Sequence, residues 1–203
     1  MIKITPYSLA LSLKTGSPLI KGLIRLLPSC QRKRIFQVVL PFIPQRDRAC
    51  KRIDGLLDKI TPWPERVKLI NYYAPRELML NVMMHGRGGL IQVNEIFQGG
   101  RKALEVVSLD KGPGIKDLTI EAEKSKKAYL KGRYSNVGMH HICSIPDLLE
   151  IQSQDKKFVG IKEKKSFHEV PGGRIKRGCY FRIIFYSDAF KNLPIPSVKI
   201  IID

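Results

Sequence analysis

Hydrophobic and polar positions follow two different periods along this chain. Apolar residues recur every three or four positions in segments 47–60 and 65–85, as in helices that bury one face. Alternating or β-branched segments predict strands instead. The strands predicted in this way are 36–43, 90–97, 103–109, 150–153, 158–162 and 180–186, and two further helices are predicted at 116–130 and 142–149.

Turn residues separate these elements. Gly99 and Gly100 stand between two predicted strands and predict a hairpin. Pro75 is expected to kink or split the helix at 65–85, because proline removes a backbone donor. The order of helices and strands predicts an α+β fold. We expect a two-layer α/β sandwich with the helices on one face of a mixed β-sheet.

Positive charge is concentrated near the N-terminus. The chain has 203 residues, with 36 Lys and Arg against 18 Asp and Glu, for a net charge of +18. The first 52 residues hold eleven of the basic residues and only one acid. Segment 1–34 therefore reads as a basic arm, either a short amphipathic helix around 19–27 or a poorly ordered segment. A domain over 35–187 and a tail over 188–203 complete the predicted organisation.

The cysteines and the apolar stretches indicate the cellular compartment of the protein. The four cysteines form no CxxC pair, so we expect free thiols in a reducing compartment rather than a disulfide framework or a zinc site. The longest apolar stretches are much shorter than the ~20 residues that a membrane-spanning helix needs. These features predict a cytoplasmic protein without a membrane span.

A polar stripe runs along the predicted helix at 65–85. Glu77, Asn81 and His85 recur every four residues and should lie on one helix face, between leucines and methionines. An acid, an amide and an imidazole in this arrangement suit a binding or catalytic site. The alternative is a solvated stripe on an ordinary amphipathic helix.

A carboxylate ends the predicted strand 103–109. Asp110 is followed by Gly112 and Gly114, which lack Cβ atoms and would let a flat ligand approach the backbone. A carboxylate at a strand end can accept a charge-assisted hydrogen bond from an exocyclic amine. The alternative is a plain turn after a strand.

A third polar segment lies before the predicted helix 142–149. Gly132, Ser135 and Gly138 would present backbone N–H groups to an anion at a helix N-terminus. Five basic residues precede or enter this segment and could form a basic flap: Lys124, Lys126, Lys127, Lys131 and Arg133. The alternative is a surface loop with solvated lysines.

Together, the three segments resemble the GHKL group of ATP-binding domains, which have the histidine kinase-like ATPase fold. The stripe of Glu77, Asn81 and His85 is similar to the N box of that group, and residues 110–115 and 132–138 are similar to its G1 and G2 boxes. The resemblance covers about residues 35–187 and is strongest to the anti-sigma-factor type serine/threonine protein kinases.

The resemblance implies a role for each residue. Asn81 would bind Mg²⁺ and Glu77 would be the catalytic general base. Asp110 would accept the adenine amino group of ATP, with Gly112 and Gly114 beside the nucleotide. The remaining nucleotide-binding positions implied are His85, Gly132, Ser135 and Gly138. Two places differ from the family pattern: Met139-His140-His141 follows Gly138, and Cys179 stands where a threonine is frequent.

These residues lead to one main hypothesis and two alternatives. The main one is a Mg-ATP-dependent regulatory serine/threonine kinase, which would phosphorylate or sequester a regulatory protein such as an antagonist-type domain or a sigma factor and so regulate transcription. One alternative is a catalytically weak, nucleotide-binding partner-switching module. The other is nucleic-acid contact through the basic arm, which is less favoured because a triphosphate suffices for the charge near the flap. A homodimer is compatible with each of these three hypotheses.

Overall fold

The computed structural model describes residues 31–57, 74–98, 100–132, 138–161, 166–170 and 175–186. Most of the predicted arm, the predicted tail, and residues 65–73 of a predicted helix lie outside these residues. Among the described residues no helix is long and apolar enough to cross a membrane.

The described strands form a single sheet in the order β1-β2-β3-β7-β4-β5-β6. Every described pair is antiparallel, so the expected mixed sheet is wrong for this part of the chain. The reason is the place of the last strand: β7 enters between β3 and β4, which run in the same direction and would otherwise be neighbours. The strands are β1 (Gln31–Leu40), β2 (Gly89–Gln98), β3 (Arg101–Asp110), β4 (Leu148–Ser153), β5 (Lys156–Ile161), β6 (Ser166–Val170) and β7 (Cys179–Tyr186).

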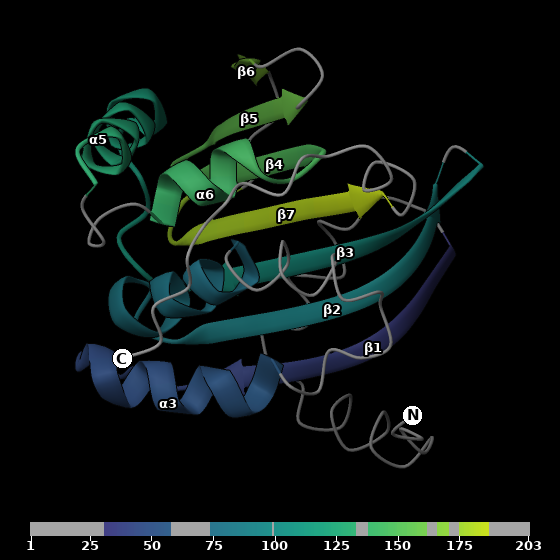
Figure 1. Ribbon diagram of the computed structural model, residues 1–203, viewed down its shortest axis with the longest axis horizontal. Helices are drawn as coiled ribbons and strands as arrows, with labels where there is room; N and C mark the ends of the chain where they lie inside the picture. Colours follow the sequence, from purple (N-terminus) through teal and green to yellow (C-terminus); the bar gives the residue numbers. More distant parts are fainter. Residues whose placement is uncertain are drawn as a thin grey trace.

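Helices lie on one face of this sheet (Figure 1). They are α3 (Arg46–Leu57), a helix over 74–80 that continues as the π-helical turn η1 (Asn81–His85), α5 (Leu118–Leu130) and α6 (Gly138–Ser144). The main core lies between helices and sheet, where Leu78 and Met83 pack with Val106 and Ile183. This core fixes the helix over 74–85 against the central strands, and so positions its polar stripe.

The sequence located most of these elements. The hairpin of β2 and β3 is confirmed, as are α5 and strands β5 and β7, each with bounds within two residues of the prediction. The helix α6 begins four residues before its predicted start and ends at Ser144, where a helix was expected to continue. The short strand β6 was missed inside a segment read as a basic loop. Strand β1 begins at Gln31, so the basic residues 32–34 belong to the sheet.

A buried ionic network lies on the face of the sheet opposite the helices. The carboxylate of Glu105, which is fully buried, accepts hydrogen bonds from Arg32 at 2.7 Å and from Arg182 at 2.6 Å. The side-chain amide of Asn94 donates a third bond at 2.9 Å. Burial alone would raise the pKa of Glu105, but the two guanidinium groups outweigh it and hold the pKa below its usual value. The network joins strands β1, β2, β3 and β7.

Candidate functional site

The predicted polar stripe lies on the helix over 74–85, but its three residues occupy different environments. The Glu77 side chain is 14% exposed, Asn81 is partly buried, and His85 is exposed. The helix changes from α to π at Asn81, whose carbonyl accepts the Gly86 N–H at 2.7 Å. This wider turn was not predicted from the sequence, and turns of this kind are frequent at functional sites.

Glu77 lies where three elements meet. Its carboxylate is 4.0 Å from the Arg46 guanidinium at the start of α3. Burial raises the pKa of Glu77 above its usual value, while the positive charges of Arg46 and Arg76 oppose the rise. On the other side Gly138 begins α6, and a Cβ atom placed there would overlap the Glu77 carboxylate. The structure therefore brings together two of the predicted site residues, Glu77 and Gly138.

Asp110 ends β3 beneath the C-terminal end of the 74–85 helix, and it is only 7% exposed. Its Oδ1 accepts the backbone N–H of Gly112 at 2.8 Å and that of Cys179 at 3.0 Å. Burial raises the pKa of Asp110 to about 6, although both N–H bonds act to lower it. No described residue donates a hydrogen bond to Oδ2. One carboxylate oxygen is thus fixed by the backbone, and the second remains as an acceptor.

Glycines surround Asp110 because backbone segments meet there. A Cβ on Gly86 would overlap the Asp110 side chain, and one on Gly178 would overlap the Asp110 carbonyl. A Cβ on Gly112 would lie 2.8 Å from the carbonyl oxygen of His85. The sequence attributed Gly112 to the close approach of a ligand. In the structure its missing side chain is what lets three protein segments pack around Asp110.

Ser153 stabilises the loop that follows Asp110, a role that was not predicted from the sequence. Its hydroxyl accepts the Ile115 N–H at 2.7 Å and donates to the Gly178 carbonyl at 3.2 Å. The Gly114 backbone, at a φ of +85°, passes directly over this hydroxyl. Ser153 is a strand-end serine before a turn, a position that carries no distinctive sequence signal. Its partners come from segments distant in sequence.

The third predicted segment is only partly described. Gly132 lies two residues after the end of α5, with a φ of +65° and open space around it, Gly138 begins α6, and Ser135 lies outside the described residues. The two helices are joined by Tyr129 of α5, whose ring centroid is 4.5 Å from that of His140. The His140 N–H also donates to the Ser125 hydroxyl at 2.8 Å. His140 thus packs against α5.

The predicted residues form two groups along one helix. Asp110, Gly112 and Gly114 lie at its C-terminal end with Ser153 and Gly178, whereas Glu77 and Gly138 meet about two turns before η1 ends. Asn81 lies between the two groups. Among the described residues no group of three or more His, Cys, Asp or Glu side chains could hold a metal ion.

Comparison with known proteins leaves the family open. No protein-family model matches the chain, and no curated protein matches it at a significant level.

Proposed function

We propose that this chain binds ATP, with the adenine at Asp110 and the phosphates toward Asn81 and Glu77. The observation that carries the proposal is the state of the Asp110 carboxylate. Two backbone N–H groups hold Oδ1, while Oδ2 has no donor among the described residues. An adenine amino group is a donor that such an oxygen would accept. With a pKa of about 6, Asp110 is mostly ionised at neutral pH.

The second support is the spacing along the helix. Gly86 packs against Asp110, and Glu77 lies nine residues earlier, which corresponds to roughly 13 Å of helix at 1.5 Å per residue. An extended nucleoside triphosphate has a comparable length. A nucleotide with its base at Asp110 would therefore reach Glu77 with its terminal phosphate, and would pass Asn81 on the way.

The chemistry of the site residues suits Mg²⁺ only when the ion is also bound by the nucleotide. Magnesium prefers oxygen ligands and usually combines one or two protein ligands with phosphate oxygens and water. Asn81 offers a single amide oxygen, and the described residues contain no carboxylate cluster that would hold the ion alone. Mg²⁺ would accordingly enter with the nucleotide and neutralise charge on its phosphates.

For the reaction we propose phosphoryl transfer to a serine or threonine hydroxyl of a regulatory partner protein, as in anti-sigma-factor type kinases. Glu77 is the residue placed to take the hydroxyl proton, because burial raises its pKa toward the range in which a carboxylate is an effective base. Arg46, at 4.0 Å, keeps the carboxylate ionised and oriented. The competing function is a nucleotide-controlled binding module with little transfer activity, for which Glu77 would be only a packing partner of Gly138.

Titration of Mg-ATP into wild type and Asp110→Asn tests the binding proposal. Asparagine keeps an acceptor oxygen for the two backbone N–H groups but loses the negative charge, so we expect affinity to fall by about 10- to 100-fold. The matched control is Asp155→Asn, which removes the same charge from an exposed turn with a φ of +63° that asparagine tolerates. Equal affinity in wild type and Asp110→Asn, with both folded, would remove the proposal.

A further inference from the structure

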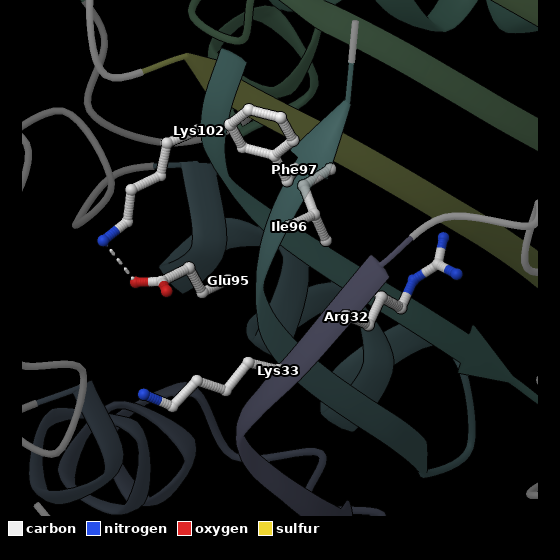
Figure 2. A pocket seen from close by; sticks show the side chains of 6 residues that line it. All are labelled: Arg32, Lys33, Glu95, Ile96, Phe97 and Lys102. Atoms are coloured by element: carbon white, nitrogen blue, oxygen red, sulfur yellow. Dashed lines mark ion pairs between the residues drawn. The ribbon is translucent and has the colours of Figure 1, made fainter. Parts of the chain in front are cut away.

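A second candidate site lies at the opposite end of the sheet from Asp110. A hollow of about 270 Å³, which we call the distal hollow, is lined by Arg32, Lys33, Glu95, Ile96, Phe97 and Lys102. Figure 2 shows these side chains. Asp110 ends β3, whereas the distal hollow adjoins its beginning. Along a ten-residue strand this separation is roughly 30 Å, so the distal hollow is independent of the proposed nucleotide site.

Strand register brings two distant basic segments together there. Lys33 of β1 pairs with Glu95 of β2, and Phe97 of β2 pairs with Lys102 of β3. Lys33, Glu95 and Lys102 point to the same side, while Arg32 points to the other (Figure 2). Arg32 is bound by Glu105 at 2.7 Å, which anchors the beginning of β1 to the sheet. The backbone of the strands that bear these lysines is thus held in place within the sheet.

The distal hollow has more positive than negative charge. Glu95 forms an ion pair with Lys102 at 2.8 Å, but the Lys102 side chain is exposed and that of Glu95 is partly exposed, and ion pairs at the surface contribute little to stability. Separating the pair to admit a competing anion therefore costs little free energy. Lys33 is exposed, and its strand register places it opposite Glu95.

Phe97 distinguishes this surface from an ordinary cluster of lysines. Its side chain is 54% exposed at the edge of the distal hollow. A flat aromatic ring near cationic side chains is a combination with which proteins bind single strands, because bases stack on the ring and phosphates pair with the lysines. An acidic protein segment would use the lysines but would gain no stacking from a single exposed ring.

We propose that the distal hollow binds single-stranded nucleic acid, with a base stacked on Phe97 and neighbouring phosphates on Lys33 and Lys102. The charge distribution agrees with this assignment. The first 52 residues carry eleven basic residues and one acid, and of these basic residues the proposed nucleotide site uses only Arg46. Strand β1 places Arg32 and Lys33 of this basic region directly at the distal hollow.

Fluorescence anisotropy with a labelled oligothymidylate and a labelled oligouridylate, each of about 15 nucleotides, tests the proposal. We expect binding that weakens between about 50 and 200 mM salt. Phe97→Leu should weaken binding about tenfold and leave the salt dependence unchanged, because only stacking is lost. Lys33→Gln with Lys102→Gln should reduce the slope of log affinity against log salt by about 1.4, or about 0.7 for each phosphate contact. The two oligonucleotides decide between DNA and RNA as the natural ligand.

The matched control is Lys124→Gln with Lys127→Gln, which removes the same charge from exposed positions on α5. This control should bind almost as wild type does. Three results would overturn the proposal: no binding at 50 mM salt, an equal loss in the control and the Lys33/Lys102 variant, or displacement of the oligonucleotide by polyglutamate of similar length at equal concentration. The last result would identify an acidic protein as the partner. Thermal melts verify that each variant folds.

Discussion

The backbone N–H of Cys179 donates to Asp110 Oδ1 at 3.0 Å, across 69 positions in sequence. The contact depends on the main chain, so it requires no particular side chain at position 179. The Cys179 thiol instead faces the Ser153 hydroxyl at 3.4 Å, and burial raises its pKa to about 12, which keeps it neutral. A cysteine at this position therefore leaves the support of Asp110 intact.

The first prediction concerns how the Asp110 carboxyl makes the stability of the protein depend on pH. Burial raises its pKa from 3.8 to about 6, so the protonated form is favoured in the folded state. The raised pKa of Asp110 therefore adds to the free energy of unfolding in full below pH 3.8. This contribution, up to about 3 kcal/mol, is lost as the pH rises through 6. Asp110→Asn should remove this dependence and should be more stable than wild type at pH 7.5.

Denaturant unfolding at several pH values between 4 and 8 measures the effect. Asp155→Asn serves as control, because Asp155 lies in an exposed turn. An Asp110→Asn variant that is less stable than wild type at pH 7.5 would show that the charged carboxylate stabilises the fold.

Ser153 is predicted to support both stability and nucleotide affinity. Ser153→Ala removes the acceptor of the Ile115 N–H and the donor to the Gly178 carbonyl, which should lower the free energy of unfolding by about 1–3 kcal/mol. Loosening of the loop after Asp110 should weaken ATP binding as well. The control, Ser144→Ala, loses one exposed bond to a helix carbonyl and should change stability by less than about 0.5 kcal/mol. Similar losses in both variants would contradict the assignment.

Glu77→Gln tests the proposed base. Glutamine keeps the size of the side chain and loses its basicity, so phosphoryl transfer should fall at least about 100-fold while ATP affinity stays within a few fold. Glu169→Gln, at an exposed position of β6, is the matched control. Unchanged transfer in Glu77→Gln would exclude Glu77 as the base, whereas a lack of transfer in the wild type would favour the binding-module alternative.

Gly138→Ala probes the same carboxylate from the opposite side. The added methyl would overlap the end of the flexible Glu77 side chain, which must move away. We expect a decrease in phosphoryl transfer with a small change in stability, measured by single-turnover kinetics and thermal melts. Gly55→Ala is the control, because open space surrounds Gly55 and alanine in a helix interior should stabilise by roughly 0.5–1 kcal/mol. Full activity in Gly138→Ala would show that the position of Glu77 is not critical.

The buried network predicts a large loss of stability on Glu105→Gln. The change leaves Arg182, only 3% exposed, without its ionic partner, and breaking a buried pair typically costs about 3–5 kcal/mol. Because the pKa of Glu105 is held low, its contribution is present above the ordinary pKa and is lost as pH falls. The exposed pair broken by Glu95→Gln should matter by less than about 1 kcal/mol. Urea unfolding compares the two, and equal effects would contradict the prediction.

Local signals in the sequence were enough for the elements whose causes are local. The helix α5 has an N-cap, since Asp117 accepts the Ile120 N–H at 3.0 Å, and β2 and β3 alternate around a glycine turn. They also located Asp110 and Glu77. The position of β7, the π turn at Asn81 and the role of Ser153 all depend on contacts between distant segments. No periodicity or motif encodes such contacts, so the sequence could not predict them.

The place of β7 has a consequence for the order in which the protein can form. The two halves of the sheet, β1 to β3 and β4 to β6, share no strand pair until residues 179–186 are inserted between them. During synthesis the ribosome must release nearly the whole domain before the halves can join and before Asp110 gains its Cys179 donor. Contacts of such long sequence separation slow folding. A nascent chain lacking β7 would hold two half-sheets with open central edges, a natural target for chaperones.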